Sequence, residues 1–360
     1  LFDLTESLKS TLPTKMQENV VFFFVNSGSE ANDLALRIAK TYQAHKHSKD
    51  IFQMKSSTIV AMQHAYHGHT DATLSISHYK FKDQAGYQHS QLKHVKIIST
   101  PSLTTSANND KNIFTSVQQA LNDDSNEVLC CFIHETILGC AGQVPLSKSM
   151  LHSSYEAIHN AGGIVIADEV QTGFYRVGSH CFAFDSLKLI PDIITVGKPF
   201  GNGMPIGAVI VSKQIAEVFS FNNIEYFNTF GGNPVCCRAA IAQIEESKKL
   251  QRHVQKIGSY LKQLLILLSQ QHPLIATNGA IRGCGLFWGV ELIDEQGKPA
   301  SKQAEFICNY LRKLKILVSR DGPFNNVLKL KPPLVFDKKD VQVLIGGLHI
   351  ALSICQLQKF

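Results

Sequence analysis

The sequence predicts an α/β fold, with a mostly parallel central sheet in a large domain and a smaller α+β domain after it. Short apolar segments rich in β-branched residues alternate with helical patterns up to about residue 245, which is typical of a parallel sheet. Two of these segments run into a charged residue and a glycine-bearing turn. Beyond that point the pattern changes to long helices with few strands, so we expect domains at 1–245 and 246–360.

Composition excludes several classes of protein. The chain has 360 residues, 44% of them hydrophobic, which is ordinary for a globular protein. The net charge of +6 comes from scattered Lys and Arg, which mildly favours an anionic substrate but makes no nucleic-acid footprint. The longest apolar runs, such as LLILL at 264–268, are too short to span a bilayer. We therefore expect neither a nucleic-acid nor a membrane partner.

The cysteines indicate a reducing compartment. There are nine, an odd number, with no C-x-x-C pair and no metal-ligand spacing, so we predict buried thiols, no metal site and a cytoplasmic protein. The opening LFDLTESLKSTLP has neither the basic region nor the apolar region of a signal peptide. A mitochondrial location is the alternative if a transit segment lies upstream of Leu1.

The first elements form a predicted anion site. Residues 1–18 have leucines at helical spacing and predict an amphipathic helix, and VVFFFV at 20–25 predicts a buried strand. The polar turn after the strand contains Gly28 and Ser29 and leads into a long helix. Free backbone N–H groups and the helix dipole favour an anion there, and a phosphate is our interpretation. The alternative is a plain serine N-cap.

Two further predicted strands deliver side chains to their ends. The strand and turn at 57–70 bring Tyr66 and His67, and an aromatic ring at that position can stack on a flat ligand or serve packing alone. EVLCCFIHE at 127–135 ends in Glu135, which contacts substrate or pairs with an arginine; the pattern leaves both open. Residues 101–112 are polar and predict a loop.

Asp168 and Lys198 are the main catalytic candidates. IVIAD ends at Asp168, and the next apolar run, IITV, ends two residues before Lys198, which stands in TVGKPFGNGMP. In open α/β sheets the ligand lies beyond the carboxyl ends of the strands. A lysine that forms a Schiff base and a carboxylate that keeps a pyridine nitrogen protonated suit pyridoxal 5'-phosphate. Either residue alone would be ordinary.

The rest of the chain yields fewer functional signals. IGAVIVS at 206–212 predicts an antiparallel or edge strand, and Thr229 and two glycines precede a long helix. In the second domain, 283–292 predicts a strand that bends at its glycines and 314–319 predicts another strand. A helix closes the chain from residue 340.

Taken together, these motifs resemble the class III pyridoxal-phosphate aminotransferases of fold type I. No single motif is specific, but their number and order are. The motifs are SGSEAN at 27–32, AYHG at 65–68, ADEVQTGFYRVG at 167–178, TVGKPFGNGMP at 195–205, NTFGGNP at 228–234 and RGCGLFWGVEL at 282–292.

The resemblance implies roles for the candidate residues. Lys198 is expected to form the Schiff base, Asp168 to pair with the pyridinium nitrogen, and Gln171 to lie beside the phenolic oxygen of the ring. Thr229 is expected to reach the phosphate bound by a neighbouring subunit, which implies a homodimer with shared active sites. The expected cofactor-binding set is Gly28, Ser29, Tyr66, His67, Glu135, Asp168, Gln171, Lys198 and Thr229.

Within the family, the sequence is most similar to phospho-lyases acting on phosphoethanolamine or 5-phosphohydroxylysine. The similarity lies in AYHGHTDATLSISHYKF at 65–81, CAGQ at 140–143, EYFNTFGG at 225–232 and SRDGPFNNVLKLKPPL at 319–334. Many class III transaminases have an arginine, which clamps the substrate carboxylate, where this chain has Lys329. A lysine lacks the planar fork that matches a carboxylate. We therefore expect an enzyme that eliminates phosphate and ammonia from a phosphorylated amine.

Two alternatives remain. One is a transaminase that moves an amino group from an ω-amino acid or amine to a keto acid. The other is a non-catalytic binding or scaffold protein, because family members carry an N-terminal segment that this chain lacks; we expect the chain to be a fragment of a longer protein. Tyr175, at a position where glycine is common, and residues 99–112 also depart from the family pattern.

Overall fold

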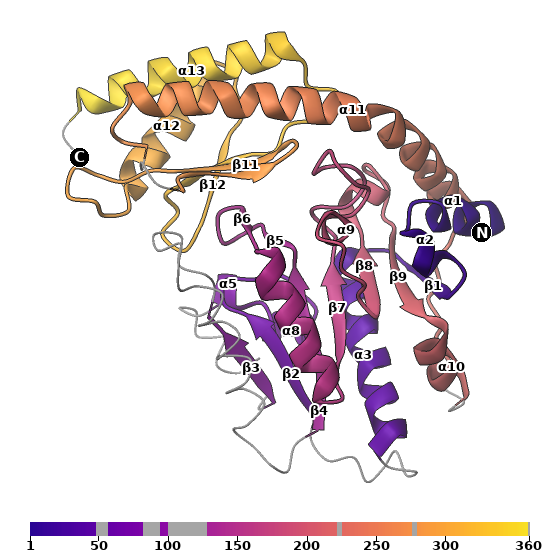
Figure 1. The fold of residues 1–360 in the computed structure, drawn as a ribbon. Helices are drawn as coiled ribbons and strands as arrows, with labels where there is room; N and C mark the ends of the chain where they lie inside the picture. Colours follow the sequence, from indigo (N-terminus) through magenta and orange to yellow (C-terminus); the bar gives the residue numbers. More distant parts are fainter. Residues whose placement is uncertain (48–56, 82–93, 100–127, 222–224, 276–278, 359–360) are drawn as a thin grey trace. The chain divides into compact units, whose positions relative to one another are not determined.

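The computed structural model describes residues 1–47, 57–81, 94–99, 128–221, 225–275 and 279–358 (Figure 1). The predicted loop at 101–112 lies outside them. The chain forms two compact units. The first comprises Leu1–Thr136, Leu146–Phe174 and Cys181–Glu246, and the second comprises Ile137–Pro145, Tyr175–His180 and Ser247–Phe360. The domain boundaries at 1–245 and 246–360 stay a prediction.

A mostly parallel sheet of seven strands forms the centre of the first unit, which confirms the predicted fold class. Only β9 runs against its two neighbours; it is antiparallel, one of the two possibilities predicted for 206–212, but it lies inside the sheet. In sheet order the strands are β1 (Val20–Val25), β9 (Gly207–Ser212), β8 (Ile193–Val196), β7 (Ile164–Asp168), β4 (Val128–Glu135), β2 (Ser57–Met62) and β3 (Val95–Ile98).

Helices cover both faces of this sheet (Figure 1). Helices α3 (Gly28–His47) and α10 (Lys213–Phe221) pack on the face that carries Ile133 and Ile166. Helix α8 (Lys148–Asn160) lies on the other face, where Tyr155 Oη and His134 Nε2 are 2.9 Å apart. Residues 133 and 134 point to opposite faces, as successive residues of a strand do. Both faces are apolar because both are buried.

The predicted helix at 1–18 is wrong in one respect. It is two helices, α1 (Phe2–Lys9) and α2 (Thr14–Gln17), and the chain breaks just before Pro13. Proline lacks the N–H that would continue the first helix, and it restricts the residue before it to extended conformations. Leu4 and Leu8 are buried, as their spacing predicts. The other short elements of this unit are α4 (Asp71–Ser75), α5 (His78–Phe81), α9 (Ala183–Ser186) and the 3₁₀ turn η2 (Lys198–Phe200).

The second unit contains an antiparallel sheet of four strands in the order β10 (Ile281–Cys284), β11 (Phe287–Glu291), β13 (Val327–Leu330) and β12 (Ser319–Asp321). The bent strand predicted at 283–292 is two strands, because Gly285 turns the chain back at φ +54°. The strand predicted at 314–319 contributes only its last residue, since Lys315 adopts φ +62°. A small ribbon pairs β5 (Ile137–Leu138) with β6 (Val144–Pro145).

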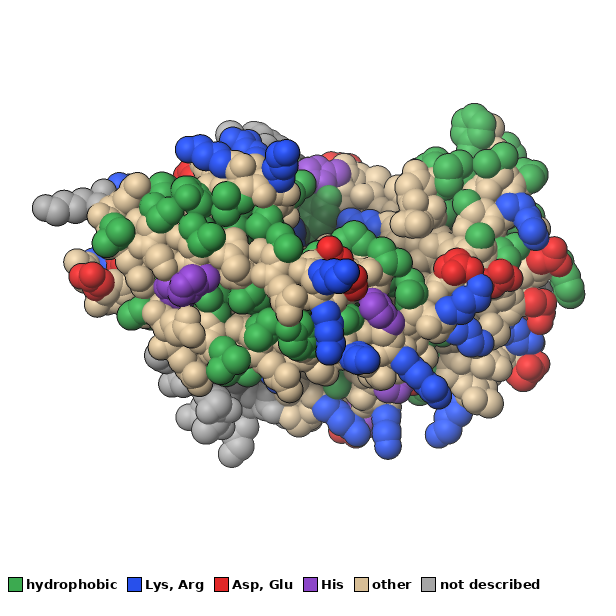
Figure 2. All heavy atoms as spheres, turned by 90° about the horizontal axis from the view of Figure 1, so that it is seen from above, with side chains coloured by type: hydrophobic (Ala, Val, Ile, Leu, Met, Phe, Trp, Pro, Cys, Tyr) green, Lys and Arg blue, Asp and Glu red, His purple; other side chains and the backbone are tan. Residues whose placement is uncertain are grey.

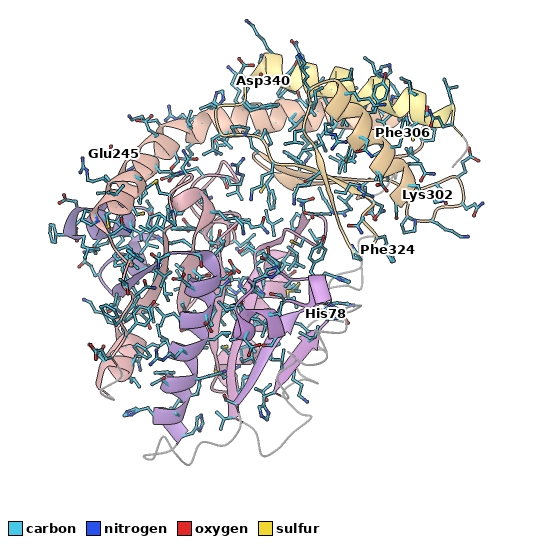
Figure 3. The ribbon with its side chains drawn as sticks, turned by 180° about the vertical axis from the view of Figure 1, so that it is seen from behind. His78, Glu245, Lys302, Phe306, Phe324 and Asp340 are labelled. Atoms are coloured by element: carbon cyan, nitrogen blue, oxygen red, sulfur yellow. The ribbon has the colours of Figure 1, made fainter. Side chains whose placement is uncertain are left out.

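Three helices complete the second unit. Helix α11 (Pro234–Gln271) enters it at Ser247, and α12 (Ser301–Lys313) and α13 (Lys338–Gln356) pack with it around a core that includes Trp288. Asp340, at the start of α13 (Figure 3), accepts a hydrogen bond from Asp337 N at 3.0 Å, and the Asp337 carboxylate caps the helix in return. No helix in the described ranges is long and apolar enough to cross a membrane.

Candidate active site

Three neighbouring strands of the first unit end at the same edge of the sheet. Strands β4, β7 and β8 are parallel, and Glu135 is paired in register with Asp168. Asp168 is in turn paired with Thr195, three residues before Lys198. The sheet therefore brings the predicted acid, the predicted amine and Glu135 to one edge, where a parallel sheet binds its ligands.

Asp168 is held rigidly. Its side chain is 3% exposed. Oδ2 lies 2.7 Å from Asn32 Nδ2 and 2.8 Å from His67 Nδ1, and Oδ1 accepts a hydrogen bond from Val170 N at 3.0 Å. Three donors around a buried carboxylate fix its orientation and compensate for its loss of water.

Asn32 is a site residue that sequence analysis missed. Its amide donates to Asp168 Oδ2 and to His67 O, both at 2.7 Å, and its Oδ1 accepts from Thr195 Oγ1 at 2.6 Å. One side chain of α3 thus ties the ends of β7 and β8 to the turn that carries His67. The signal in the sequence was its place as the last residue of SGSEAN, on the same helix turn as Gly28.

His67, predicted to lie at the cofactor rim, contacts Asp168. It is buried, its backbone N–H donates to Ser77 Oγ at 2.8 Å, and its ring pairs with the carboxylate through Nδ1. Its Nε2 is buried without a hydrogen-bond partner among the described residues. His67 therefore helps to hold the Asp168 carboxylate in place.

Lys198 follows β8 in an unusual backbone conformation. Its φ of +38° is rare for a residue with a side chain and marks a constrained turn. The preceding Gly197 allows close packing, since a Cβ there would lie 3.0 Å from Gly28 N. The Lys198 side chain is exposed, and Nζ lies 5.7 Å from the centre of the Tyr66 ring. No carboxylate forms an ion pair with it within the described part of the chain. Its amine is available.

Tyr66, Glu135 and Gln171 form a second group at this edge. The buried Glu135 accepts from Tyr66 N at 3.1 Å through Oε1 and from Gln171 Nε2 at 3.4 Å through Oε2. The carboxylate thereby holds the turn that presents the Tyr66 ring. To the two predicted roles of Glu135, contact with substrate or with an arginine, these bonds add a third, which is to position Tyr66 and Gln171.

The turn before α3 has the features of an anion site. Ser27 Oγ accepts from Glu30 N at 3.1 Å and so acts as the N-cap, which leaves Ser29 Oγ for another contact, with His69 N at 3.2 Å. Gly68 has φ +140°, and a Cβ there would lie 2.6 Å from Ser29 Oγ. The glycine permits the close approach of the two turns.

Glu169, next to Asp168, was also missed. It points away from the edge and is fully buried, where it accepts from Ala183 N and Phe184 N, both at 2.9 Å, and from Thr172 Oγ1 at 2.5 Å. Burial raises the pKa of this carboxyl from an ordinary 4.5 to about 7, although these donors lower it. Glu169 closes the loop that carries Val170 and Gln171.

Thr229 is not brought into these contacts. It lies on the loop between α10 and α11, where the side chains of Phe227 and Phe230 are 78% and 69% exposed. The loop is attached to the start of α3 through Asn228, which donates to Glu30 Oε2 at 3.1 Å.

Lys329 belongs to the second unit and is paired. Its Nζ lies 2.7 Å from Asp321 Oδ2 on the adjacent strand. The same oxygen accepts from Gln143 Nε2 at 3.2 Å, and Gln143 is fully buried. The carboxylate is 7% exposed and the lysine side chain 27%, so the pair is only partly accessible to solvent.

No group of three or more His, Cys, Asp or Glu side chains in the described ranges is arranged to hold a metal ion. Seven of the nine cysteines are buried, and none is in a disulfide. On the face that Figure 2 shows, Lys and Arg side chains gather from the centre to the lower right, with acidic side chains at the right-hand edge.

The residues at the edge of the sheet fit pyridoxal phosphate. An available amine, a buried carboxylate held by three donors and an aromatic ring at 5.7 Å from the amine are the groups that the ring of this cofactor needs. The α3 turn supplies backbone N–H groups for a phosphate. All of these residues belong to one unit.

The family pattern of the class III aminotransferases matches residues 1–352. The chain belongs to this family. Class III aminotransferases are pyridoxal-phosphate-dependent enzymes, so the cofactor and the enzymatic nature of the chain follow from membership. The resemblance seen in the motifs is thereby confirmed.

Relatives within the family carry different activities in their names. The chain is 38% identical to an alanine–glyoxylate aminotransferase 2-like protein of Drosophila melanogaster, over 95% of this chain and 70% of the relative. It is 35% identical to ethanolamine-phosphate phospho-lyase homolog 1 of Caenorhabditis elegans, over 98% and 76%. A solved phospholyase from Arthrobacter in complex with phosphoethanolamine is 29% identical, with a TM-score of 0.85, over 98% of this chain and 81% of that chain.

Proposed function

We propose that this class III enzyme is a phospho-lyase that releases phosphate and ammonia from a small phosphorylated amine such as phosphoethanolamine. The observation that carries the proposal is Lys329, which occupies the sequence position where many class III transaminases have a carboxylate-clamping arginine. In the structure its Nζ lies 2.7 Å from Asp321 Oδ2, on the neighbouring strand. The similarity to the Arthrobacter phospholyase supports the same substrate class.

Lys329 suits a phosphate better than a carboxylate for a geometric reason. An ammonium is a compact point charge with rotatable donors, whereas a guanidinium presents a planar fork that matches the two oxygens of a carboxylate. A lysine in place of the arginine loses the fork that clamps a carboxylate, whereas lysine remains a common phosphate ligand as a point charge. A substrate that carries phosphate in place of carboxylate is the expected consequence.

Pyridoxal phosphate, when bound, supplies an electron sink for the substrate carbon that carries the amine. We assign Lys198 Nζ two tasks: it holds the cofactor covalently, and once free it takes the proton from that carbon. Asp168 would hold a proton at the ring nitrogen, with Asn32 and His67 fixing the carboxylate. Gly28 and Ser29 would bind the phosphate, Tyr66 would cover the ring, and Gln171, held by Glu135, would bind near the phenolic oxygen.

The substrate decides the outcome once the proton has been removed. With phosphate on the adjacent carbon, the C–O bond breaks and phosphate leaves with the electron pair. Water then hydrolyses the remaining enamine fragment, which supplies the aldehyde oxygen and releases ammonia. Without such a leaving group, the same residues support transamination, which is the activity in the name of the Drosophila relative.

One experiment separates these two functions. The purified protein, loaded with cofactor, is given phosphoethanolamine without a keto acid, and phosphate and acetaldehyde are measured. Release of both in equal amounts supports the phospho-lyase. Activity that appears only with a keto acid, and without phosphate release, would establish the transaminase instead.

We also propose a homodimer. Phe227, Phe230 and Val235 are 78%, 69% and 66% exposed, close together in sequence and on either side of Thr229. Exposed aromatic side chains are enriched at the cores of protein interfaces. A second copy of the chain would cover them and bring Thr229 to the phosphate of the partner site. Sedimentation analysis tests this, and we retain the cytoplasm as the proposed compartment, with mitochondria as the alternative.

A further inference from the structure

The side chain of Asn228 connects two parts of the first unit that are 202 residues apart. Its Oδ1 accepts from Asn26 Nδ2 at 2.8 Å and from Gly231 N at 3.0 Å. Its Nδ2 donates to Glu30 Oε2 at 3.1 Å and to Tyr226 Oη at 3.2 Å. Both polar atoms of the amide are fully used, two bonds each.

Glu30 is the other centre of this network. Its Oε2 also accepts from Asn26 N at 2.9 Å and from Asn26 Nδ2 at 3.2 Å, while its own N–H donates to Ser27 Oγ. The carboxylate therefore braces the turn that contains Gly28 and Ser29. Through Asn228, the same carboxylate holds the loop 226–231.

That loop has an inner and an outer side. Tyr226 and Asn228 are half-buried, and the Tyr226 ring meets Phe23 edge-on at 6.2 Å. Phe227, Thr229 and Phe230 are exposed. A side chain at Gly231 would overlap the backbone oxygen of Phe24, so the loop lies directly on the end of β1. The inner side fixes the loop, and the outer side is presented to solvent or to a partner.

We propose that Asn228 and Glu30 are positioning residues that couple the phosphate turn of one subunit to the surface it offers to a second copy of the chain. This inference rests on the proposed function, in which the turn binds the cofactor phosphate and the loop meets the partner. Because the two share one hydrogen-bond network, ordering either side orders the other. Cofactor binding and dimerisation then strengthen each other by the same factor.

The test measures the dissociation constant of the dimer, by mass photometry and sedimentation on the full chain, with and without pyridoxal phosphate. For the unmodified protein we expect the cofactor to tighten the dimer by about tenfold, within the usual range of coupling between sites. In Asn228→Ala the dissociation constants with and without cofactor should differ by no more than about twofold. Substitution of a residue with a merely structural role would raise both dissociation constants by the same factor and leave their ratio unchanged.

Three further variants sharpen the test. Asn233→Ala is the matched control, because its bonds to Phe230 O and Cys236 N lie within the loop and the start of α11; the ratio should persist. Asn228→Asp places two carboxylates next to each other, and the dissociation constants with and without cofactor should become equal. Adding Glu30→Gln should restore the difference between them, since the glutamine amide can donate to the new carboxylate.

The outcomes distinguish this inference from the proposed function. If Asn228→Ala binds cofactor, dimerises and keeps the ratio of the unmodified protein, the coupling role is overturned and the proposed function stands. If the double variant fails to recover the coupling that Asn228→Asp loses, the Glu30 contact is not the route. If the unmodified protein takes up no cofactor or stays monomeric, both the inference and the proposed function fall.

Discussion

Lys198 and Lys329 stand in opposite environments. Lys198 is exposed on a constrained turn, and no described carboxylate forms an ion pair with it, whereas Lys329 lies in β13 with Asp321 at 2.7 Å. Lys198 follows the end of β8 in the first unit, and Lys329 lies within the antiparallel sheet of the second unit. Under the proposed function this contrast corresponds to two tasks, reaction for Lys198 and substrate binding for Lys329.

Lys198→Ala should break this contrast most completely. Removal of the reactive amine should lower kcat/KM by more than about a thousandfold, because covalent attachment and proton removal are both lost. The measurements are phosphate release and the mass of the protein after borohydride reduction in the presence of cofactor. Lys213→Ala, an exposed lysine of the same unit, should behave like the unmodified protein. Cofactor covalently retained in Lys198→Ala would refute the assignment of the amine.

Asp168→Asn should have the next largest effect. The new amide would face the amide of Asn32 at the position where Asp168 now accepts at 2.7 Å, and the negative charge proposed to keep the ring nitrogen protonated is removed. We expect kcat to fall by about 100- to 1,000-fold, as when one preorganised electrostatic contact is lost. Steady-state kinetics and cofactor titration measure this separately from binding. A variant with full kcat would show that the carboxylate has no part in the reaction.

The strand-end residues were the most predictable part of this site. Asp168 and Lys198 follow apolar β-branched runs, and parallel strands end at one edge, so periodicity alone brings them together. Asn32, Glu169 and Asn228 were not predictable in the same way. Asn32 and Asn228 have partners far away in sequence, and only the folded chain shows that the amide of Asn32 reaches Asp168, 136 residues later. Glu169 has partners 3 to 33 residues away, but no periodic pattern links it to them.

The misplaced elements have local causes. Pro13 divides the first helix, and the positive φ angles at Gly285 and Lys315 interrupt two predicted strands. Hydrophobic periodicity reports which residues are buried but not where the chain reverses. His67 shows the same limit at the site, since its position at a strand end was predicted but its hydrogen bond to Asp168 was not.

Glu169→Gln tests the buried carboxyl group that follows Asp168 and holds the loop beside the site. Since burial raises the pKa of Glu169 from 4.5 to about 7, the folded state keeps a proton that the unfolded chain releases between these values. The free energy of unfolding contributed by this group should therefore fall as pH rises through that range, by on the order of 3 kcal/mol, and level off above it. Chemical denaturation from about pH 5 to 8 measures the slope.

The difference between Glu169→Gln and the unmodified protein isolates this group. Buried His134, whose pKa burial lowers from 6.5 to about 4, contributes the opposite slope at acidic pH, but equally in both proteins. Glu156→Gln, at an exposed position on α8, should keep the slope of the unmodified protein. Identical slopes in Glu169→Gln and the unmodified protein would mean that Glu169 does not titrate there.

Lys329→Ala should have the smallest effect, and on binding and stability only. The loss of the ammonium leaves the Asp321 carboxylate buried beside Gln143 without its cation, and because Lys329 is partly exposed we expect a loss of about 1 to 2 kcal/mol in the free energy of unfolding. KM for phosphoethanolamine should rise about tenfold while the cofactor stays covalently bound. Adding Asp321→Asn removes the uncompensated charge, so the double variant should regain stability but not substrate affinity. Equal recovery of stability and substrate affinity would mean that Lys329 acts only as the partner of Asp321. A loss of bound cofactor in Lys329→Ala would mean that the two lysines do not have separate roles.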